Sequence, residues 1–337
     1  MKSPELKKGT LGYACDLDKV DPITMLDYTA TAKKAGFDAI WVFDHFHPWH
    51  HTNAVESHSW IWMTTALERV TQIPFGTAVT APILRYHPAL IAQAFGTMQA
   101  IYGRRVILGV GTGEAMNEIP LGYAWPSMDE RRERLIEAVK IIRRLSTEEF
   151  VNFSGKYFTL KNANLYMKPD LPIYIAGMGP KMAEVAGKFG DGFITSNQPI
   201  QHVKNVLFPA IKEGARSEGK EFENIAKVTE LDVSYDEDVE KAIQSAKRLG
   251  SSFTHIAHTD PISDPREIEK LDEMVTAKQL TERYAVSNNP DDHIKKIEQL
   301  FHTGFDHIYI YSVSPNENKC LEMYRTKVLP YFKALEK

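Results

Sequence analysis

The chain has 337 residues, of which 43% are hydrophobic and 25% charged, with a formal net charge of −4 and a pI near 6.3. This composition supports a full hydrophobic core and argues against nucleic acid as the main partner. No apolar run reaches the roughly 18 residues of a transmembrane helix, and the N-terminal segment lacks the apolar stretch of a signal peptide. Cys15 and Cys320 have no metal-type spacing. We therefore expect a reduced, cytoplasmic protein without a membrane partner.

Strand-like and helix-like segments alternate along the chain. Short apolar runs rich in β-branched and aromatic residues predict buried strands. These strands are expected at residues 10–14, 39–43, 75–80, 106–110, 172–176, 192–196, 226–233 and 307–311. Amphipathic spacing, with proline at the start or glycine at the end of several segments, predicts helices. The helices are expected at residues 22–35, 59–70, 88–102, 129–145, 180–189, 200–218, 239–249, 290–301 and 316–335.

This order of elements predicts a (β/α)8 TIM barrel, because each strand is mostly followed by a helix over a suitable length. Less regular stretches near residues 150–170 and 250–283 are interpreted as insertions. A doubly wound sheet is the alternative, since periodicity alone cannot close a barrel. No low-complexity linker interrupts residues 1–337, so we expect a single domain.

Chemistry-bearing residues first gather where the second predicted strand ends. The apolar run 39–43 leads directly into Asp44, His45 and Trp49, and Pro48 prevents the strand from continuing. In a parallel barrel, active sites lie at the carboxyl ends of strands. A carboxylate, an imidazole and an indole at this position therefore predict a functional site, with an ordinary surface loop as the alternative.

Glycine-rich segments follow two later strands. Residues 106–118 read Val-Ile-Leu-Gly-Val-Gly-Thr-Gly-Glu-Ala-Met-Asn-Glu, which places Thr112 and Glu114 at a strand end. The Gly-x-Gly-x-Gly spacing differs from a dinucleotide fingerprint, and a tight turn remains an alternative. Residues 175–180 lead into a helix, and the free N–H groups at the start of that helix could hold a phosphate. The alternative is that this segment is only a glycine turn before the helix. No spacing resembles a zinc site, so we expect no metal.

Together these motifs resemble those of the coenzyme F420 (deazaflavin)-dependent dehydrogenases of the bacterial luciferase-like superfamily. The resemblance covers almost the whole chain and is carried by residues 44–49 (Asp-His-Phe-His-Pro-Trp), 85–93, 109–118 and 179–180. Two branches share these motifs, the archaeal secondary-alcohol dehydrogenases and the actinobacterial glucose-6-phosphate dehydrogenases. The His-Pro-Trp and Gly-Met-Gly-Pro segments are more similar to the alcohol branch.

The resemblance implies a homodimeric barrel with F420 at its C-terminal mouth. It implies that the catalytic residues are His45, Glu114 and Trp49. The residues that it implies contact the cofactor are Asp44, Ala78, Val79, Thr112, Asn117, Met178 and Gly179. The residues that it implies contact the substrate are Trp49, Ser196 and Arg283. It also implies a cis peptide bond between Ala78 and Val79.

The implied reaction moves a hydride between a secondary alcohol, or its ketone, and C5 of the deazaflavin. His45 is the expected general base, because imidazole titrates near neutral pH. Glu114 is the expected acid toward the reduced ring, and Trp49 can donate its N–H to a developing oxyanion. The alternatives are a sugar-6-phosphate dehydrogenase, an FMN-dependent luciferase-like monooxygenase and a non-enzymatic cofactor carrier, which fold alone cannot separate.

The positions of lysine and arginine residues indicate the substrate class, because a pocket for a sugar phosphate needs several cationic side chains. The sugar-phosphate branch uses two lysines and an arginine. Here the lysine positions fall within residues 197–199 and at Thr259, where no lysine stands, and only Arg283 is retained. Trp49 and Trp60 suggest a small, largely apolar pocket, which favours short secondary alcohols or ketones. The lysines that could still reach the pocket are Lys181 and Lys204.

Overall fold

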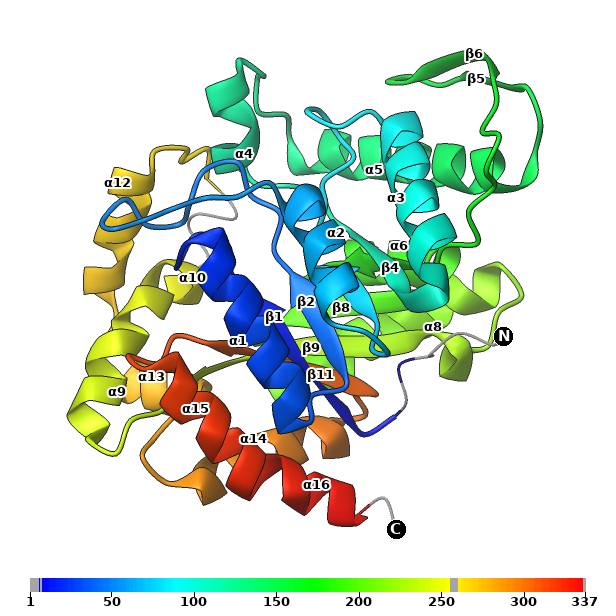
Figure 1. The fold of residues 1–337 in the computed structure, drawn as a ribbon. Coiled ribbons are helices and arrows are strands. Elements are labelled where there is room, and N and C mark those ends of the chain that lie inside the picture. Colours follow the sequence, from blue (N-terminus) through cyan, green and yellow to red (C-terminus); the bar gives the residue numbers. More distant parts are fainter. Residues whose placement is uncertain (1–5, 7, 255–259, 336–337) are drawn as a thin grey trace.

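The structure, a computed structural model, describes residues 6, 8–254 and 260–335. In these residues a parallel sheet forms the centre of the molecule (Figure 1). Its barrel strands are β1 (Thr10–Cys15), β2 (Ala39–Val42), β3 (Phe75–Thr77), β4 (Val106–Val110), β7 (Ile173–Ala176), β8 (Gly192–Ser196), β9 (Ala226–Ser234) and β11 (His307–Ser312). β1 pairs with both β2 and β11, and β8 pairs with β9, so the sheet closes into the predicted (β/α)8 barrel. The doubly wound alternative is therefore wrong.

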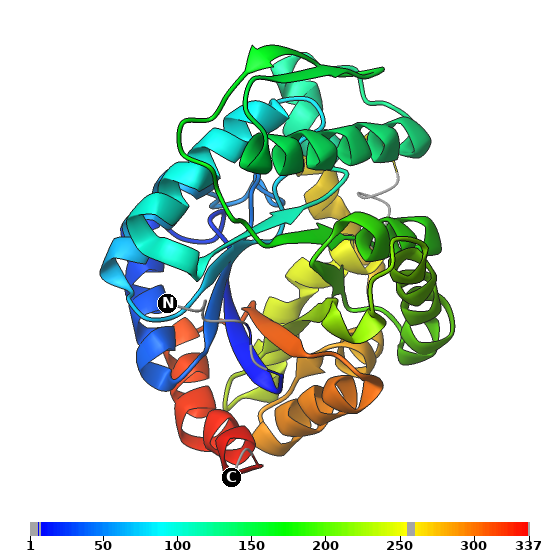
Figure 2. The same ribbon diagram turned by 90° about the vertical axis from the view of Figure 1, so that its right-hand side faces the viewer.

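Helices surround these strands (Figure 2). Their bounds are α1 Pro22–Ala35, α2 Ser59–Arg69, α3 Pro88–Tyr102, α4 Ala115–Glu118, α5 Met128–Thr147, α6 Pro180–Phe189, α7 Ile200–His202, α8 Phe208–Ser217, α9 Val239–Ala246, α10 Gly250–Thr254, α12 Pro265–Ile268, α13 Ala277–Arg283, α14 Pro290–Thr303, α15 Glu317–Met323 and α16 Leu329–Leu335. Helix α1 ends at Gly36, whose φ of 111° is in the left-handed region that glycine adopts readily. Helices α1 and α15 pack together, so segments from the first and last parts of the sequence lie side by side.

The strands divide their side chains between two cores, because successive residues of a strand point to opposite faces. Ile40 and Val42 of β2 join the large cluster between strands and helices, whereas Trp41 joins a smaller cluster inside the barrel. Trp41 Nε1 donates to His307 Nε2 at 3.0 Å, and burial lowers the pKa of His307 to about 3. His307 is therefore a neutral packing residue of the barrel interior.

The two irregular stretches contain elements that periodicity did not predict. Residues 150–170 include an antiparallel hairpin of β5 (Val151–Ser154) and β6 (Thr159–Ala163), which stands away from the barrel in Figure 1. Residues 250–283 include the short helices α10, α12 and α13, after which β10 (Ala285–Val286) extends the sheet beside β9. Thr259 lies outside the described residues. That the chain forms one domain stays a prediction.

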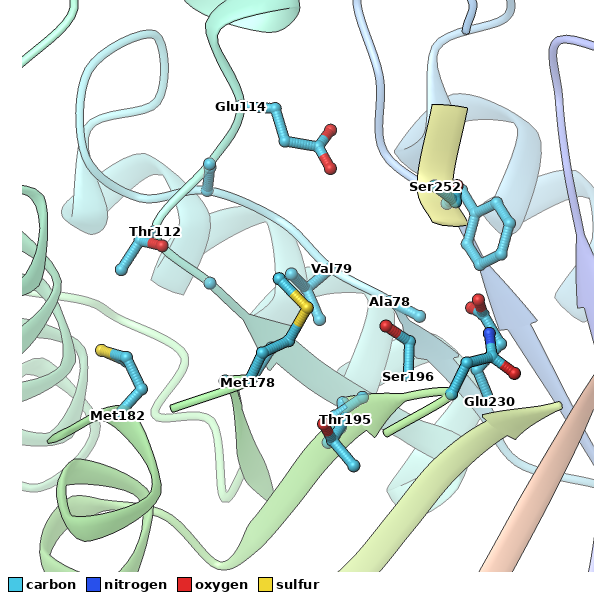
Figure 3. Close-up of a pocket in the computed structure, with 18 of the residues that line it drawn as sticks. Ala78, Val79, Thr112, Glu114, Met178, Met182, Thr195, Ser196, Glu230 and Ser252 are labelled. Atoms are coloured by element: carbon cyan, nitrogen blue, oxygen red, sulfur yellow. The ribbon is translucent and has the colours of Figure 1, made fainter. Parts of the chain in front are cut away.

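Strand β3 is shorter than the predicted 75–80. The peptide bond between Ala78 and Val79 is cis, as the resemblance implied, and the ladder is interrupted there. Thr80 rejoins the sheet through a parallel bridge with Val110 of β4. Ala78 and Val79 consequently lie in the mouth of the barrel, where Figure 3 shows them.

Candidate active site

A cavity of about 550 Å³ lies at the carboxyl ends of the barrel strands (Figure 3). Every residue that the sequence predicted for catalysis, cofactor binding or substrate binding lines this cavity. These residues are Asp44, His45, Trp49, Ala78, Val79, Thr112, Glu114, Asn117, Met178, Gly179, Ser196 and Arg283. They come from the ends of several strands, from the segments that follow them and from helices α4 and α13. The sequence thus predicted which residues converge, while the role of each stays a prediction.

The centre of the cavity holds His45, Glu114 and Trp49. His45 Nε2 lies 3.5 Å from Glu114 Oε2, and Trp49 Nε1 is 3.4 Å from the same imidazole nitrogen. The two titratable side chains are only 11% and 20% exposed. Because the indole can only donate, Nε2 accepts, which places the imidazole proton on Nδ1. Nε2 therefore carries no proton in this arrangement, and a proton that it takes up would lie next to the Glu114 carboxylate.

A buried ion-pair network supports one wall. Asp44 is 2% exposed, and its Oδ2 accepts a hydrogen bond of 2.6 Å from Thr80. Arg85 donates from Nη2 to Asp44 Oδ1 at 3.2 Å and from Nη1 to Glu118 Oε1 at 3.0 Å. Burial raises the pKa of Glu118 to about 7, although Arg85 opposes this shift. The sequence motif contained Arg85, but only the fold reveals that it binds two carboxylates.

Asn117 connects this wall to the central group. The backbone N–H of Phe46 donates to Asn117 Oδ1 at 2.7 Å, and Asn117 Nδ2 donates to Glu114 Oε2 at 3.2 Å. The short helix α4, which the sequence did not predict, starts after Glu114 and carries Asn117 on its first turn. The Asn117 amide thereby fixes the His45 loop and the Glu114 carboxylate relative to each other.

The other end of the cavity is suited to an anion. Helix α6 begins at Pro180, so the backbone N–H groups of Lys181 and Met182 in its first turn have no partner within the helix, and both residues line the cavity. A side chain at Gly179 would have nothing within 4 Å, so the backbone there is open to a ligand. Arg131, Arg132 and Lys181 line the same end, and Arg131 Nε is buried with no hydrogen-bond partner among the described residues. These features fit a phosphate next to a helix N-terminus.

One sequence expectation about the cavity is wrong. Trp60 does not line it, because the indole stacks on Tyr86 at 4.3 Å and donates to Thr80 Oγ1 at 3.1 Å. Of the two lysines that could reach the pocket, Lys181 lines it and Lys204 does not. The pocket is largely apolar, as expected, but carboxyl groups line one side of it.

The polar side consists of carboxylates that the sequence analysis missed. Asp16, 4% exposed, accepts a 2.6 Å hydrogen bond from the hydroxyl of Tyr311, and Glu230 bonds with Tyr309. Although burial opposes it, the Tyr311 hydrogen bond helps to lower the pKa of Asp16. Burial and the neighbouring Asp232 raise the pKa of Glu230 well above its usual range. The sequence signal that could have identified them is the pair of acidic residues, Glu230 and Asp232, at alternating positions of the otherwise apolar strand β9.

The loop that follows β2 is held by the insertion at residues 260–274. His50 Nε2 lies 2.8 Å from Asp272 Oδ2, and the backbone N–H groups of His51 and Thr52 donate to Glu269 Oε2. On the other side, Trp49 donates its backbone N–H to Asp18 Oδ2 at 2.7 Å. The position of the Trp49 ring therefore depends on two segments distant in sequence.

Replacing Glu56 should change how stability depends on pH. Burial, with smaller effects from Asp16 and Asp44, raises the pKa of Glu56 to about 8. The native state therefore keeps a proton that the unfolded chain releases near pH 4.5, so this group lowers stability as the pH rises from about 4.5 through 8. For Glu56→Gln, we expect the melting temperature relative to wild type to be higher at pH 9 than at pH 5.5. The exposed Glu68→Gln is the control, and a difference independent of pH would contradict the assignment.

Two absences apply to the described part of the chain. No group of three or more His, Cys, Asp or Glu side chains is arranged to hold a metal ion there. None of the helices in the described residues is both long enough and apolar enough to cross a membrane.

The fold and the cavity define a (β/α)8 barrel protein with a ligand site at the carboxyl ends of its strands. The sequence profile of the luciferase-like monooxygenase family matches residues 12–307, and the chain belongs to this family. It is 36% identical to an F420-dependent glucose-6-phosphate dehydrogenase of Amycolatopsis mediterranei, over 96% of this chain and 99% of that protein. The corresponding protein of Mycobacterium tuberculosis is 37% identical over 96% and 98%.

A solved structure gives the other comparison. An F420-dependent secondary alcohol dehydrogenase in complex with an F420-acetone adduct superimposes with a TM-score of 0.92 at 36% identity, over 96% of this chain and 98% of that chain. The F420-dependent tetrahydromethanopterin reductase of Methanopyrus kandleri, at 21% identity and a TM-score of 0.77, shares the fold.

Proposed function

We propose that this protein is an F420-dependent oxidoreductase that acts on CH–OH groups, interconverting a secondary alcohol and its ketone. The observation that carries the proposal is the group of His45, Glu114 and Trp49 in one cavity, with Nε2 of His45 within 3.5 Å of both partners. Relatives at 36% to 37% identity over nearly the full length are F420-dependent dehydrogenases, which supports the cofactor.

The residues present fit a deazaflavin. Ala78, Val79 and Met178 offer an apolar surface for a flat ring, and the cavity extends from there to the N-terminus of α6. The backbone at Gly179, with Arg131 and Lys181, would hold the phosphate of the cofactor tail. When bound, F420 accepts or supplies the hydride.

The chain's own side chains handle the proton. His45 Nε2 takes the hydroxyl proton of the alcohol during oxidation, and the Glu114 carboxylate stabilises the imidazolium that forms. Trp49 Nε1 donates a hydrogen bond to the substrate oxygen as negative charge develops there. In the reverse direction His45 returns the proton to the carbonyl oxygen. Asn117 keeps Glu114 in place throughout through its 3.2 Å hydrogen bond.

A glucose-6-phosphate dehydrogenase is the second candidate. It is favoured by Arg283, which lines the cavity, and by the names of two relatives. Against it stand residues 197–199, which contain no lysine. A phosphate dianion is usually held by several cations with charge-assisted hydrogen bonds. We therefore place secondary alcohols and ketones first.

One experiment tests the proposed function. Purified protein is titrated with F420 and with FMN, and the loaded enzyme is then offered 2-propanol and glucose 6-phosphate while the absorbance of oxidised F420 is followed. We expect binding of F420 but not of FMN, and bleaching by the alcohol. Tighter binding of FMN would favour a monooxygenase, and F420 binding without bleaching by any alcohol would favour a carrier. A higher kcat/KM for glucose 6-phosphate would promote the second candidate.

Gly179→Ala should weaken F420 binding without disturbing the fold. The added methyl group meets no protein atom within 4 Å, and φ of −126° with ψ of 165° suits alanine. It would, however, project where the phosphate must approach the backbone. We expect a loss of affinity of about tenfold, or about 1.4 kcal/mol, in a fluorescence titration, with an unchanged melting temperature for the cofactor-free protein. Unchanged affinity would place the phosphate elsewhere.

The proposal includes a cytoplasmic homodimer. Both cysteines, Cys15 and Cys320, are buried and unpaired, which suits a reducing compartment. Dimerisation rests on the family resemblance, and sedimentation equilibrium measures it directly.

A further inference from the structure

The wall of the cavity opposite Glu114 is acidic. Figure 3 shows Ser196 and Glu230 together on that side, and in the sheet Glu230 is the register partner of Ser196. Asp232 lies two residues further along β9, so its side chain points to the same face, toward the barrel axis. A ligand that reaches beyond the central group therefore meets a carboxyl-rich surface.

The cations on this wall are already engaged by the protein. Arg283 donates to the backbone oxygens of Asn197 and Phe253 at 3.2 Å, and its charge acts on the buried Asp232. Nη2 of Arg248 is 3.5 Å from Oδ1 of Asp18. Both guanidinium groups are thus already held by acceptors of the protein, and a phosphate would have to compete with these contacts.

Polar atoms without partners nevertheless remain there. The Thr195 side chain lines the cavity and is 3% exposed, and its Oγ1 has no hydrogen-bond partner in the part of the chain that the structure describes. Oδ1 of Asp232, which is 1% exposed and lies behind Glu230 rather than on the cavity surface, also has no hydrogen-bond partner in the described part of the chain. Buried polar atoms in proteins are nearly always hydrogen-bonded, so these atoms indicate a polar ligand or ordered water.

We propose that this wall binds hydroxyl groups of an uncharged polyhydroxy alcohol and selects against its phosphorylated form. The inference rests on the proposed function and names its substrate class. Carboxyl groups and the Thr195 hydroxyl accept hydrogen bonds from substrate hydroxyls. The hydroxyl oxygen of Tyr311, whose hydrogen is donated to Asp16, can accept a further one. A phosphate dianion would instead lie near the buried pair of Glu230 and Asp232. Glu230 keeps its proton, whereas the pKa of Asp232 is about 6, so the Asp232 carboxylate repels the phosphate at neutral pH and both anions lose solvation.

Substrate comparison is the first test. With the F420-loaded enzyme, we expect kcat/KM for glucose to exceed the value for glucose 6-phosphate by about tenfold or more, and to exceed the value for 2-propanol. Asp232→Asn, which removes the negative charge of the pair, should shrink the ratio of glucose to glucose 6-phosphate by about fivefold or more. Glu223→Gln, an exposed carboxylate before the same strand, is the control and should leave the ratio unchanged.

A second test needs no turnover, so it separates this inference from the proposed function. Calorimetric titration with inorganic phosphate uses cofactor-free protein that carries Gly179→Ala, which obstructs the phosphate site at the N-terminus of α6. Binding should be weaker to Gly179→Ala alone than to Gly179→Ala combined with Asp232→Asn, with melting curves confirming that both are folded. Equal phosphate binding by the two proteins overturns the inference, even if F420 binding and alcohol oxidation are observed. A preference of wild type for glucose 6-phosphate or for 2-propanol over glucose overturns it equally. Failure of all turnover contradicts the proposed function and leaves the phosphate titration to decide.

Discussion

His45→Ala is expected to lower kcat by about 100- to 10,000-fold, the usual effect of losing a positioned general base. The imidazole is the group that lies within 3.5 Å of both Glu114 and Trp49 at the end of β2. F420 affinity should change little, because the phosphate end and the apolar ring surface of the cavity come from other strands. Stopped-flow measurement of F420 bleaching and a fluorescence titration of F420 give the two values.

The matched control for this variant is His51→Ala. His51 is exposed on the same loop and its side chain does not line the cavity. Turnover of His45→Ala within a few-fold of wild type would remove His45 from the mechanism. An equal loss in both variants would point to disturbance of the loop. If kcat of His45→Ala recovers at high pH, where hydroxide can replace the base, the assignment of a proton-transfer role is strengthened.

Arg85→Met is expected to be the most destabilising of the changes considered. It leaves Asp44 and Glu118, which are 2% and 0% exposed, without their cation. Removing one member of a buried ion-pair network costs about 3–5 kcal/mol, because the remaining charges are not compensated. Urea denaturation followed by circular dichroism measures the loss. Arg216→Met, which removes a surface pair with Glu213, should change stability by less than about 1 kcal/mol.

The deficit of Arg85→Met should depend on pH. The pKa of Glu118 is already raised to about 7 by burial, and loss of Arg85 would raise it further. A carboxyl group with a raised native pKa is protonated more readily in the native than in the unfolded state, so stability falls as the pH rises through that range. The deficit should therefore be larger at pH 8 than at pH 5.5. An equal deficit at both pH values would mean that Glu118 does not carry the effect.

Element positions were predictable because each depends on neighbours in sequence. Helix α3 has the predicted bounds, and its first residue is the proline that signalled the start. Exposure was less predictable. Ile23 fits the periodicity of α1 but is 67% exposed, because Met25 and Ala32 form the buried face instead. Which face of an element is covered depends on distant parts of the chain, and periodicity does not contain that information.

The residues of the candidate site also fall into those that the sequence predicted and those that only the fold reveals. Asp44, His45 and Trp49 were recognisable because they follow a strand directly in sequence. Glu230 and Asp232 were not, because their importance depends on which face of β9 points to the barrel axis. That orientation is set by pairing with β8 and β11, which lie far away in the chain. A one-residue change in register would have turned both carboxyl groups outward.

Closure of the barrel by β1 and β11 has a consequence for how the protein is made. The contact between Thr10 and His307 joins residues 297 positions apart, so the first strand has no partner on one side until nearly the whole chain has left the ribosome. Contacts this remote in sequence make folding slow, and unpaired apolar strands are prone to aggregate in the meantime. The nascent chain therefore carries an open sheet edge through most of its synthesis, and shielding of that edge by chaperones would govern the yield of active protein.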